Sequence, residues 1–418
     1  MQSRQPITYA LILLLVLSSI SGVFASTSMC QASFVQSVNL NQHILWQYSY
    51  SGVLRFIEVS SAEETIAFVT GIEPSTLIVL DGVTGQFLWE FRPTGLAPEN
   101  RTISGLSLSA NGEYLVIGTT GGSIYLFHRS SSEIVQHWQT NIPITAVAIS
   151  ELGTFIAIAF AGYVYFLSRL EGTPLWGEIL ANPPYIVTNM TMDRSGTNLA
   201  ASTTENKIYF LRTGDGVILW ERQNDVNTTT LELNPAGTLL FTTTRNDAVL
   251  FTEEGGIVQQ FPITPRVFTF SGDSSKIAII SVNTVYVYNT QPPTHESNRT
   301  FIETQITSLA FTFDGGILLL GTLESIQYAL EPSSFNAFWT LPLGDPIIQL
   351  LTPDMGDFFL AATTTTLIGL RIASITGVFT SLLPLVLIIL TSAALSILTF
   401  LLVRPKRPRR LLVTETDE

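Results

Sequence analysis

The sequence contains few side chains that could act together as a catalytic or metal-binding centre. Its four histidines are His43, His128, His137 and His295, and its single cysteine is Cys30. One cysteine permits neither an intrachain disulfide nor a cysteine-based metal site. The motifs of zinc peptidases, serine hydrolases and phosphate-binding loops do not occur in the sequence. We therefore predict a protein that is not an enzyme, with no cofactor, no metal and no catalytic residues.

Other polar side chains recur along the chain rather than converge. His128 and His137 fall on the outer strands of one predicted repeat, where an imidazole at a packed interface is commoner than a metal ligand. Asp193, Asp314 and Asp354 recur in one kind of turn, where aspartate usually hydrogen-bonds its own backbone. Because these aspartates belong to separate repeats, they do not form the convergent set that catalysis requires.

Four sequons could carry N-linked glycans, at Asn100, Asn189, Asn227 and Asn298. We predict that Asn100, Asn227 and Asn298 lie in connections between a fourth strand and the next first strand, which would place them on one face of the domain. Asn189 falls at or inside a first strand and is a poorer acceptor. Sequons also arise by chance in a chain rich in Thr and Asn, so their use stays open; use would indicate an address outside the cytoplasm.

These residues are positioned by a repeated pattern of short strands. Apolar runs alternate with turns, and the stretches 106–138, 147–176, 190–220 and 231–261 share one order of strands and turns. Equivalent positions of the first turn are 37 to 43 residues apart: Gly112, Gly153, Gly196, Gly237, Ser274, Gly315 and Gly356. Glycine suits such a turn because it adopts positive φ without a Cβ clash. A period near 40 residues with four strands per unit is typical of a β-propeller.

The six tryptophans fix the number of units. Five of them close the fourth strand of a unit: Trp89, Trp138, Trp176, Trp220 and Trp339. Eight units begin near residues 54, 103, 144, 187, 228, 265, 306 and 347, and the eighth lacks its outer strand. Trp46 has no unit before it, so we predict that residues 41–48 supply that strand and close the last blade. The predicted fold is all-β, an eight-bladed propeller over residues 41–371, with seven blades as the alternative.

Individual repeats resemble two families of propeller. The segments "LDGVTGQFLWEF" (80–91) and "LRTGDGVILWER" (211–222) are similar to the repeats of pyrroloquinoline-quinone-type propellers, whereas "TPDMGDFFLAA" and "NPAGTLLFTT" look more like WD40-type repeats. The resemblance implies an eight-bladed propeller more often than a seven-bladed one. Quinoprotein enzymes of that family bind a cofactor and Ca²⁺ with acidic and amide ligands, and this sequence shows no acidic cluster that could be assigned to such a site.

Both ends of the chain carry membrane-targeting signals. Residues 1–25 have a short basic start, an apolar stretch and small residues near Ala25, which is the pattern of a signal peptide. The alternative is an N-terminal membrane anchor. Residues 26–40 are predicted to be a linker. Residues 374–403 include a long uncharged apolar run and predict a single transmembrane helix. The basic residues of 404–418 place this tail in the cytoplasm, and hence the propeller outside it.

Charge and loop composition limit the function. A net charge of −13 opposes nucleic-acid binding. The longest Pro-containing loops are predicted at 92–102, 177–186 and 290–300, and such loops commonly carry the function of a propeller. We predict a cell-membrane or endomembrane protein whose extracytoplasmic propeller binds a protein or glycan partner as a scaffold. The alternatives are an assembly factor for other membrane proteins and a degenerate quinoprotein-like or lyase-like enzyme.

Overall fold

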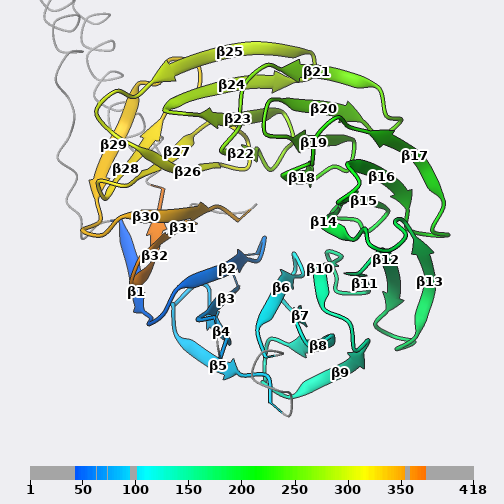
Figure 1. Ribbon diagram of the computed structural model, residues 1–418. Helices are drawn as coiled ribbons and strands as arrows, with labels where there is room; N and C mark the ends of the chain where they lie inside the picture. Colours follow the sequence, from blue (N-terminus) through cyan, green and yellow to red (C-terminus); the bar gives the residue numbers. More distant parts are fainter. Residues whose placement is uncertain (1–42, 63, 73, 95–100, 354–357, 373–418) are drawn as a thin grey trace, which may run out of the picture. The chain divides into compact units, whose positions relative to one another are not determined.

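The computed structural model describes residues 43–62, 64–72, 74–94, 101–353 and 358–372. These residues form eight four-stranded antiparallel sheets, arranged as the blades of a propeller around a common centre (Figure 1). The predicted signal peptide, linker, transmembrane helix and cytoplasmic tail lie outside the described residues, as do Asn100, Asp354 and Gly356. Within the described ranges, no helix has the length and apolar character needed to cross a membrane.

Each blade is built from four consecutive strands, except the last. Blade 1 contains β2 (Leu54–Val59), β3 (Thr65–Thr70), β4 (Thr76–Asp81) and β5 (Phe87–Phe91); blade 2 contains β6 (Ile103–Leu108), β7 (Tyr114–Thr119), β8 (Ser123–His128) and β9 (Ile134–Gln139). Blade 3 contains β10 (Ile144–Ile149), β11 (Phe155–Phe160), β12 (Tyr163–Ser168) and β13 (Pro174–Ile179); blade 4 contains β14 (Val187–Met192), β15 (Asn198–Thr203), β16 (Lys207–Arg212) and β17 (Ile218–Gln223).

The second half of the ring follows the same order. Blade 5 contains β18 (Thr230–Leu233), β19 (Leu239–Thr243), β20 (Ala248–Thr252) and β21 (Ile257–Phe261); blade 6 contains β22 (Val267–Phe270), β23 (Lys276–Ser281), β24 (Thr284–Thr290) and β25 (Pro293–Thr300). Blade 7 contains β26 (Ile306–Phe311), β27 (Leu318–Thr322), β28 (Ile326–Leu330) and β29 (Ala337–Pro342); blade 8 contains β30 (Ile347–Leu351), β31 (Phe358–Thr363), β32 (Thr366–Arg371) and β1 (Ile44–Ser49).

Blade 8 joins the two ends of the propeller and confirms the predicted closure. Strand β1 is antiparallel to β32, with Trp46 opposite Gly369, and the two strands lie side by side in Figure 1. The backbone N–H of Arg371 also donates to the carbonyl of His43 at 2.8 Å. The first segment of the ring therefore completes the last blade, and the alternative of seven blades is wrong.

The first turns of blades 2 to 7 confirm the predicted register. Gly153 has φ of +67°, and a Cβ added there would lie 2.6 Å from the ring of Tyr114 in the preceding blade, so this position tolerates only glycine without rearrangement. Ser274, which replaces glycine in blade 6, adopts the same left-handed conformation with φ of +63°. Positive φ also occurs at the other described positions: Gly112, Gly196, Gly237 and Gly315.

A β-bulge near the start of each fourth strand connects neighbouring blades. In six blades the residue after the bulge donates a side-chain hydrogen bond to a backbone carbonyl at the start of the turn between the third and fourth strands of the next blade. We call this contact the clasp bond. Its donor and acceptor pairs are Trp46 and Gly82, Trp89 and Arg129, Gln136 and Arg169, Trp176 and Thr213, Trp220 and Glu253, and Ser297 and Pro332. The tryptophans therefore mark the seams between blades, which the sequence pattern alone did not reveal.

Candidate functional site

Three neighbouring hollows lie beside blade 5. The first faces the centre of the ring and has a volume of about 340 Å³; the second lies at the seam between blades 5 and 6 with about 460 Å³; the third lies towards the rim with about 270 Å³. Thr230 and Phe268 line both the central and the seam hollow, and Thr244 lines both the seam and the rim hollow. We call these three adjoining hollows together the blade-5 groove.

The seam between blades 5 and 6 lacks a clasp bond among the described residues. Gln259 occupies the donor position of blade 5, but no side-chain bond from it to blade 6 is found among the described residues. The inner strands β18 and β22 also approach each other far less closely than β6 and β10 do at the seam of blades 2 and 3. The seam hollow itself lies at the face that carries the turn between β19 and β20, whereas the clasp bonds join turns on the opposite face.

The blade 7 and 8 seam lacks the clasp bond for a different reason. There the turn between a third and a fourth strand is replaced by the two ends of the ring. Trp339 instead packs against His43 and Phe359, with ring centroids 5.6 Å and 6.0 Å away. Aromatic packing therefore fills this seam.

Threonine hydroxyls line one wall of the seam hollow. The Oγ1 atom of Thr243 lies 2.7 Å from that of Thr229 and 2.5 Å from that of Thr230, so three hydroxyls form a hydrogen-bonded cluster. β-Branched residues favour strands, and these three stand where β18 begins and β19 ends. Thr264 adds an exposed hydroxyl from the connection to β22. The wall offers neutral hydrogen-bond donors and acceptors to a ligand.

The charged residues of the seam hollow have one sign. Arg245, in the turn between β19 and β20, and Arg266, just before β22, both line it and are exposed. No acidic residue lines the seam hollow, and neither arginine forms an ion pair within the described part of the chain. Asp247 is close in sequence, but its carboxylate accepts hydrogen bonds from Thr244 Oγ1 and Gln260 Nε2. The seam hollow is therefore locally positive in an acidic protein.

The central hollow adds one carboxyl group. Glu232 of β18 lines it, in contact with water yet enclosed by the inner strands, and this burial raises the pKa of Glu232 to about 7. The described residues contain no group of three or more His, Cys, Asp or Glu side chains placed to hold a metal ion. The groove is thus suited to hydrogen bonding and ion pairing with a ligand.

A larger hollow of about 550 Å³ at the seam of blades 8 and 1 has a different character. Its charged residues, Glu90 and Arg92, pair with each other at 3.1 Å. The hydroxyl of Tyr50 donates to the carbonyl of Thr363 at 2.5 Å, and burial raises the pKa of Tyr50 to about 12. Because its main polar groups already have partners within the protein, this hollow offers less to a ligand than the blade-5 groove.

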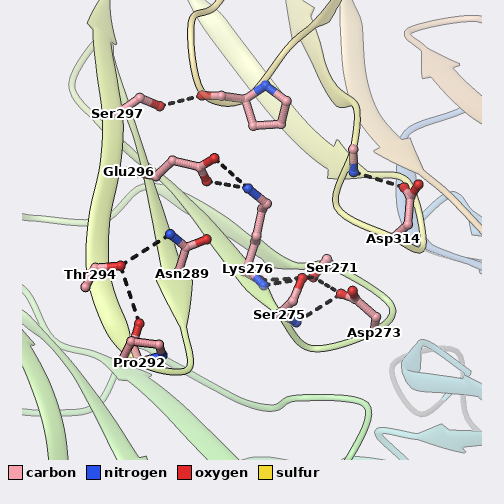
Figure 2. A network of polar contacts seen from close by, with 12 residues as sticks. Ser271, Asp273, Ser275, Lys276, Asn289, Pro292, Thr294, Glu296, Ser297 and Asp314 are labelled. Carbon is pink, nitrogen blue, oxygen red and sulfur yellow. Dashed lines mark hydrogen bonds and ion pairs between the residues drawn. The ribbon is translucent and has the colours of Figure 1, made fainter. Parts of the chain in front are cut away.

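Blade 6, on the far side of the seam, carries an unusual outer strand. Its bulge residue is Glu296, whereas the bulge residue is apolar in the other seven blades: Leu45, Leu88, Val135, Leu175, Leu219, Val258 and Phe338. Glu296 pairs with Lys276 of β23 at 2.6 Å, and the adjacent Ser297 forms the clasp bond to Pro332 (Figure 2). The ion pair lies within blade 6, and the Ser297 bond adds a polar contact to the apolar packing between blades 6 and 7.

The sequons occupy three different environments. Asn227 is exposed in the connection between β17 and β18, as predicted. The predicted position of Asn298 is wrong: it lies within β25 opposite Tyr286, because residues 293–300 pair as a strand and do not form a loop. Asn189 lies in the inner strand β14, where its Nδ2 is 3.3 Å from Ser202 Oγ and it lines the central hollow. Asn227 and Asn298 are thus the exposed candidates among the described sequons.

The histidines and turn aspartates stay apart, each with its own partner. His137 stacks on Tyr125 at 4.6 Å, and His128 Nδ1 lies 2.8 Å from Ser130 Oγ. Asp193 Oδ1 accepts the backbone N–H groups of Thr197 and Asn198, and Asp314 Oδ1 accepts that of Gly316. The two described aspartates therefore stabilise their own turns, as predicted.

The groove was not predicted from the sequence. It is built from Thr, Arg and Phe residues of no recognisable motif, contributed by strands and connections of two blades. Gln259 replaces Trp at the end of the fifth repeat, in "IVQQF", but this gives no signal, because Gln136 occupies the same position in blade 2 and forms the clasp bond.

Comparison with known proteins identifies the fold. No protein-family model matches the chain, and no curated protein sequence does. Solved structures similar to it include Saccharomyces cerevisiae Sqt1 (13% identity, TM-score 0.62, covering 79% of this chain and 98% of that one) and the C-terminal WD40 domain of Sif2 (13% identity, TM-score 0.62, 79% and 98%). Another is Chaetomium thermophilum Sqt1 bound to the N-terminus of ribosomal protein L10 (12% identity, TM-score 0.60, 77% and 97%). Such identities establish likeness of fold alone, and the described chain is accordingly a WD40-like β-propeller with eight blades.

Proposed function

We propose that this protein is a membrane-anchored, extracytoplasmic propeller that binds a protein partner through the blade-5 groove. The observation that carries the proposal is the presence of three neighbouring hollows that share lining residues, from the centre of the ring to the rim of blade 5. A groove of this kind accepts an extended chain, and a rigid propeller holds the flanking turns in place. The structure of a similar propeller, Sqt1, with the N-terminus of a ribosomal protein supports a peptide-binding mode.

The test is recovery of a partner with the full chain, tagged at the C-terminus and purified in detergent at native expression. Thr264→Trp would obstruct the seam hollow from an exposed position. Ser51→Trp is the matched control, because Ser51 is exposed and lines the separate hollow of blades 8 and 1. We expect a reproducible partner with the wild type and with Ser51→Trp, and its loss with Thr264→Trp. A protein that stays solitary, or a partner retained by both variants, would contradict the proposal.

The membrane topology rests on the sequence signals at 1–25 and 374–418 and has its own test. Expression in a cell with N-glycosylation should attach a glycan at the exposed Asn227. Peptide:N-glycosidase should then increase the electrophoretic mobility of the wild type, and Asn227→Gln should lose one glycan increment. Extraction of the protein by alkaline carbonate without detergent would contradict the anchor.

A further inference from the structure

We propose that the seam hollow recognises a carboxylate side chain, so that the partner presents an extended segment with acidic residues between apolar ones. This inference rests on the proposed function and specifies the chemistry of the ligand. Arg245 and Arg266 are the charged residues that line the hollow, and no acidic residue lines it. An arginine guanidinium binds a carboxylate through two parallel hydrogen bonds, which gives both attraction and orientation.

Hydrogen bonds hold the backbone at or next to each of the two arginines, one on either side of the seam. Thr244, next to Arg245, closes its turn through a 2.8 Å hydrogen bond from its backbone N–H to the carbonyl of Asp247. The backbone N–H of Arg266 donates to the carbonyl of Ile280 at 2.8 Å. Because both backbones are anchored, little ordering of the chain is needed when the side chains close on a ligand. A carboxylate between them would contact blade 5 and blade 6 at once, across the seam that lacks a clasp bond.

The rest of the lining favours a peptide as the source of the carboxylate. Hydroxyls of Thr230 and Thr264 can pair with backbone amide and carbonyl groups of an extended segment. Val267 and Phe268 form an apolar wall beside the arginines. In an acidic residue flanked by apolar residues, the carboxylate can meet the arginines, the backbone can meet the hydroxyls, and the apolar side chains can meet the apolar wall. An acidic sugar has hydroxyl groups in place of the apolar side chains.

The probe is a short fluorescent peptide of alternating leucine and glutamate, titrated by anisotropy against the full chain in detergent. The matched peptide replaces glutamate by glutamine. Arg245→Gln and Arg266→Gln each remove one positive charge from an exposed position. Lys207→Gln is the control, because it removes one positive charge from the start of β16 in blade 4, next to the corresponding turn and outside the groove.

We expect the wild type and Lys207→Gln to bind the glutamate peptide alike, and each arginine variant to bind it about tenfold more weakly, as for loss of a charge-assisted hydrogen bond. The affinity of the wild type for the glutamine peptide should be lower by a similar factor than its affinity for the glutamate peptide. High salt should weaken binding of the glutamate peptide. Equal binding of both peptides, or of wild type and arginine variants, would overturn the inference. Displacement of the peptide by an oligogalacturonate that binds more tightly would assign the site to acidic sugars and also overturn it.

The two proposals fail in different ways. If Thr264→Trp releases the partner but the arginine variants retain it at wild-type affinity, the groove binds a protein and the carboxylate recognition is wrong. If no partner is recovered but the glutamate peptide binds in an arginine-dependent manner, the carboxylate site stands and the assignment of a protein partner under native conditions is wrong.

Discussion

The seam between blades 1 and 2 and the seam between blades 5 and 6 are built differently. At the first, Trp89 forms the clasp bond at 2.8 Å, Arg55 donates to the carbonyl of Ile103 at 2.9 Å, and Glu58 accepts the N–H of Leu108 at 2.6 Å. The second has no clasp bond among the described residues, and a hollow replaces the contact between its inner strands.

The open seam is nevertheless packed below the groove. Phe241 contacts Phe268 with ring centroids 4.5 Å apart, and Phe261 contacts Tyr288 at 4.8 Å. Apolar burial between the sheets therefore holds blades 5 and 6 together, as it holds blades 1 and 2. The comparison shows that aromatic packing is sufficient to join two blades without a clasp bond.

The largest expected effect comes from removal of the closing strand. Deletion of residues 43–49 removes β1 and leaves β32 as an unpaired edge in blade 8. Loss of the buried Trp46 alone should cost about 3–5 kcal/mol, so we expect most of the stability to be lost and aggregation to increase. Thermal unfolding followed by circular dichroism measures this. An unchanged melting temperature would contradict the role of β1 in closing the ring.

A pair of substitutions compares the clasped and the open seam directly. Trp89→Ala should reduce the free energy of unfolding by about 3–5 kcal/mol, because it removes a buried ring and the clasp bond. Gln259→Ala, at the same repeat position, should cost less than about 0.5 kcal/mol. Urea unfolding of both variants provides the measurement. Similar losses would mean that Gln259 joins its seam as strongly as Trp89 does.

The closed seam should also make stability depend on pH. Burial between the blades raises the pKa of Glu58 to about 8, although Leu108 donates a hydrogen bond to its carboxylate. The folded state therefore holds a proton that the unfolded state releases near its ordinary pKa, about 4.5. The stability that this proton provides is complete below pH 4.5 and is lost as the pH rises through 8.

Glu58→Gln removes this titration and keeps an oxygen that can accept from Leu108. We expect the variant to be more stable than the wild type at pH 8 by about 1–2 kcal/mol. This free energy is smaller than the full pKa shift of Glu58 would give, because Glu58 keeps some contact with water. The two proteins should differ less at pH 5. Melting temperatures between pH 5 and 9 test this, and parallel curves for the two proteins would contradict it.

Glu232→Gln should likewise flatten the dependence of the melting temperature on pH near pH 7.

The smallest effect concerns the polar clasp bond of blade 6. Ser297→Ala removes the hydrogen bond to the carbonyl of Pro332 and should cost about 1 kcal/mol. Thr294→Ala, on the same strand but exposed, is the control and should cost less than about 0.5 kcal/mol. If the two variants unfold at the same urea concentration, the hydroxyl of Ser297 does not contribute to the seam.

The blade count and register could be predicted because they depend on local signals that repeat. Glycine at a left-handed turn, as at Gly153, and a strand-ending tryptophan recur with nearly constant spacing. Trp46 extended the same pattern to the far end of the ring. Each signal concerns only a few adjacent residues and is weak by itself. Its repetition in successive units is what made the number of blades predictable.

The seams and the groove could not be predicted, because they depend on contacts between blades. Trp89 is the counterpart of Gln259 in blade 1, and it donates a hydrogen bond to a backbone carbonyl 40 residues later in the sequence. No residue near either position predicts such a contact. Asn298 was misplaced for a related reason: two prolines and a sequon suggested a loop, but pairing with β24 and the Lys276–Glu296 ion pair stabilise a strand there. Tertiary contacts outweighed the local preference of "TQPPTHESNRT".

The antiparallel pairing of β1 with β32 also determines how the ring would respond to a pulling force. Ile44 lies opposite Leu370, so the chain enters and leaves the propeller at adjacent points of one blade. A load applied between these two points would separate the strands from that end, and their hydrogen bonds would break one after another. Sequential rupture requires less force than simultaneous shear of the same bonds, so blade 8 should be the first part of the propeller to yield under tension.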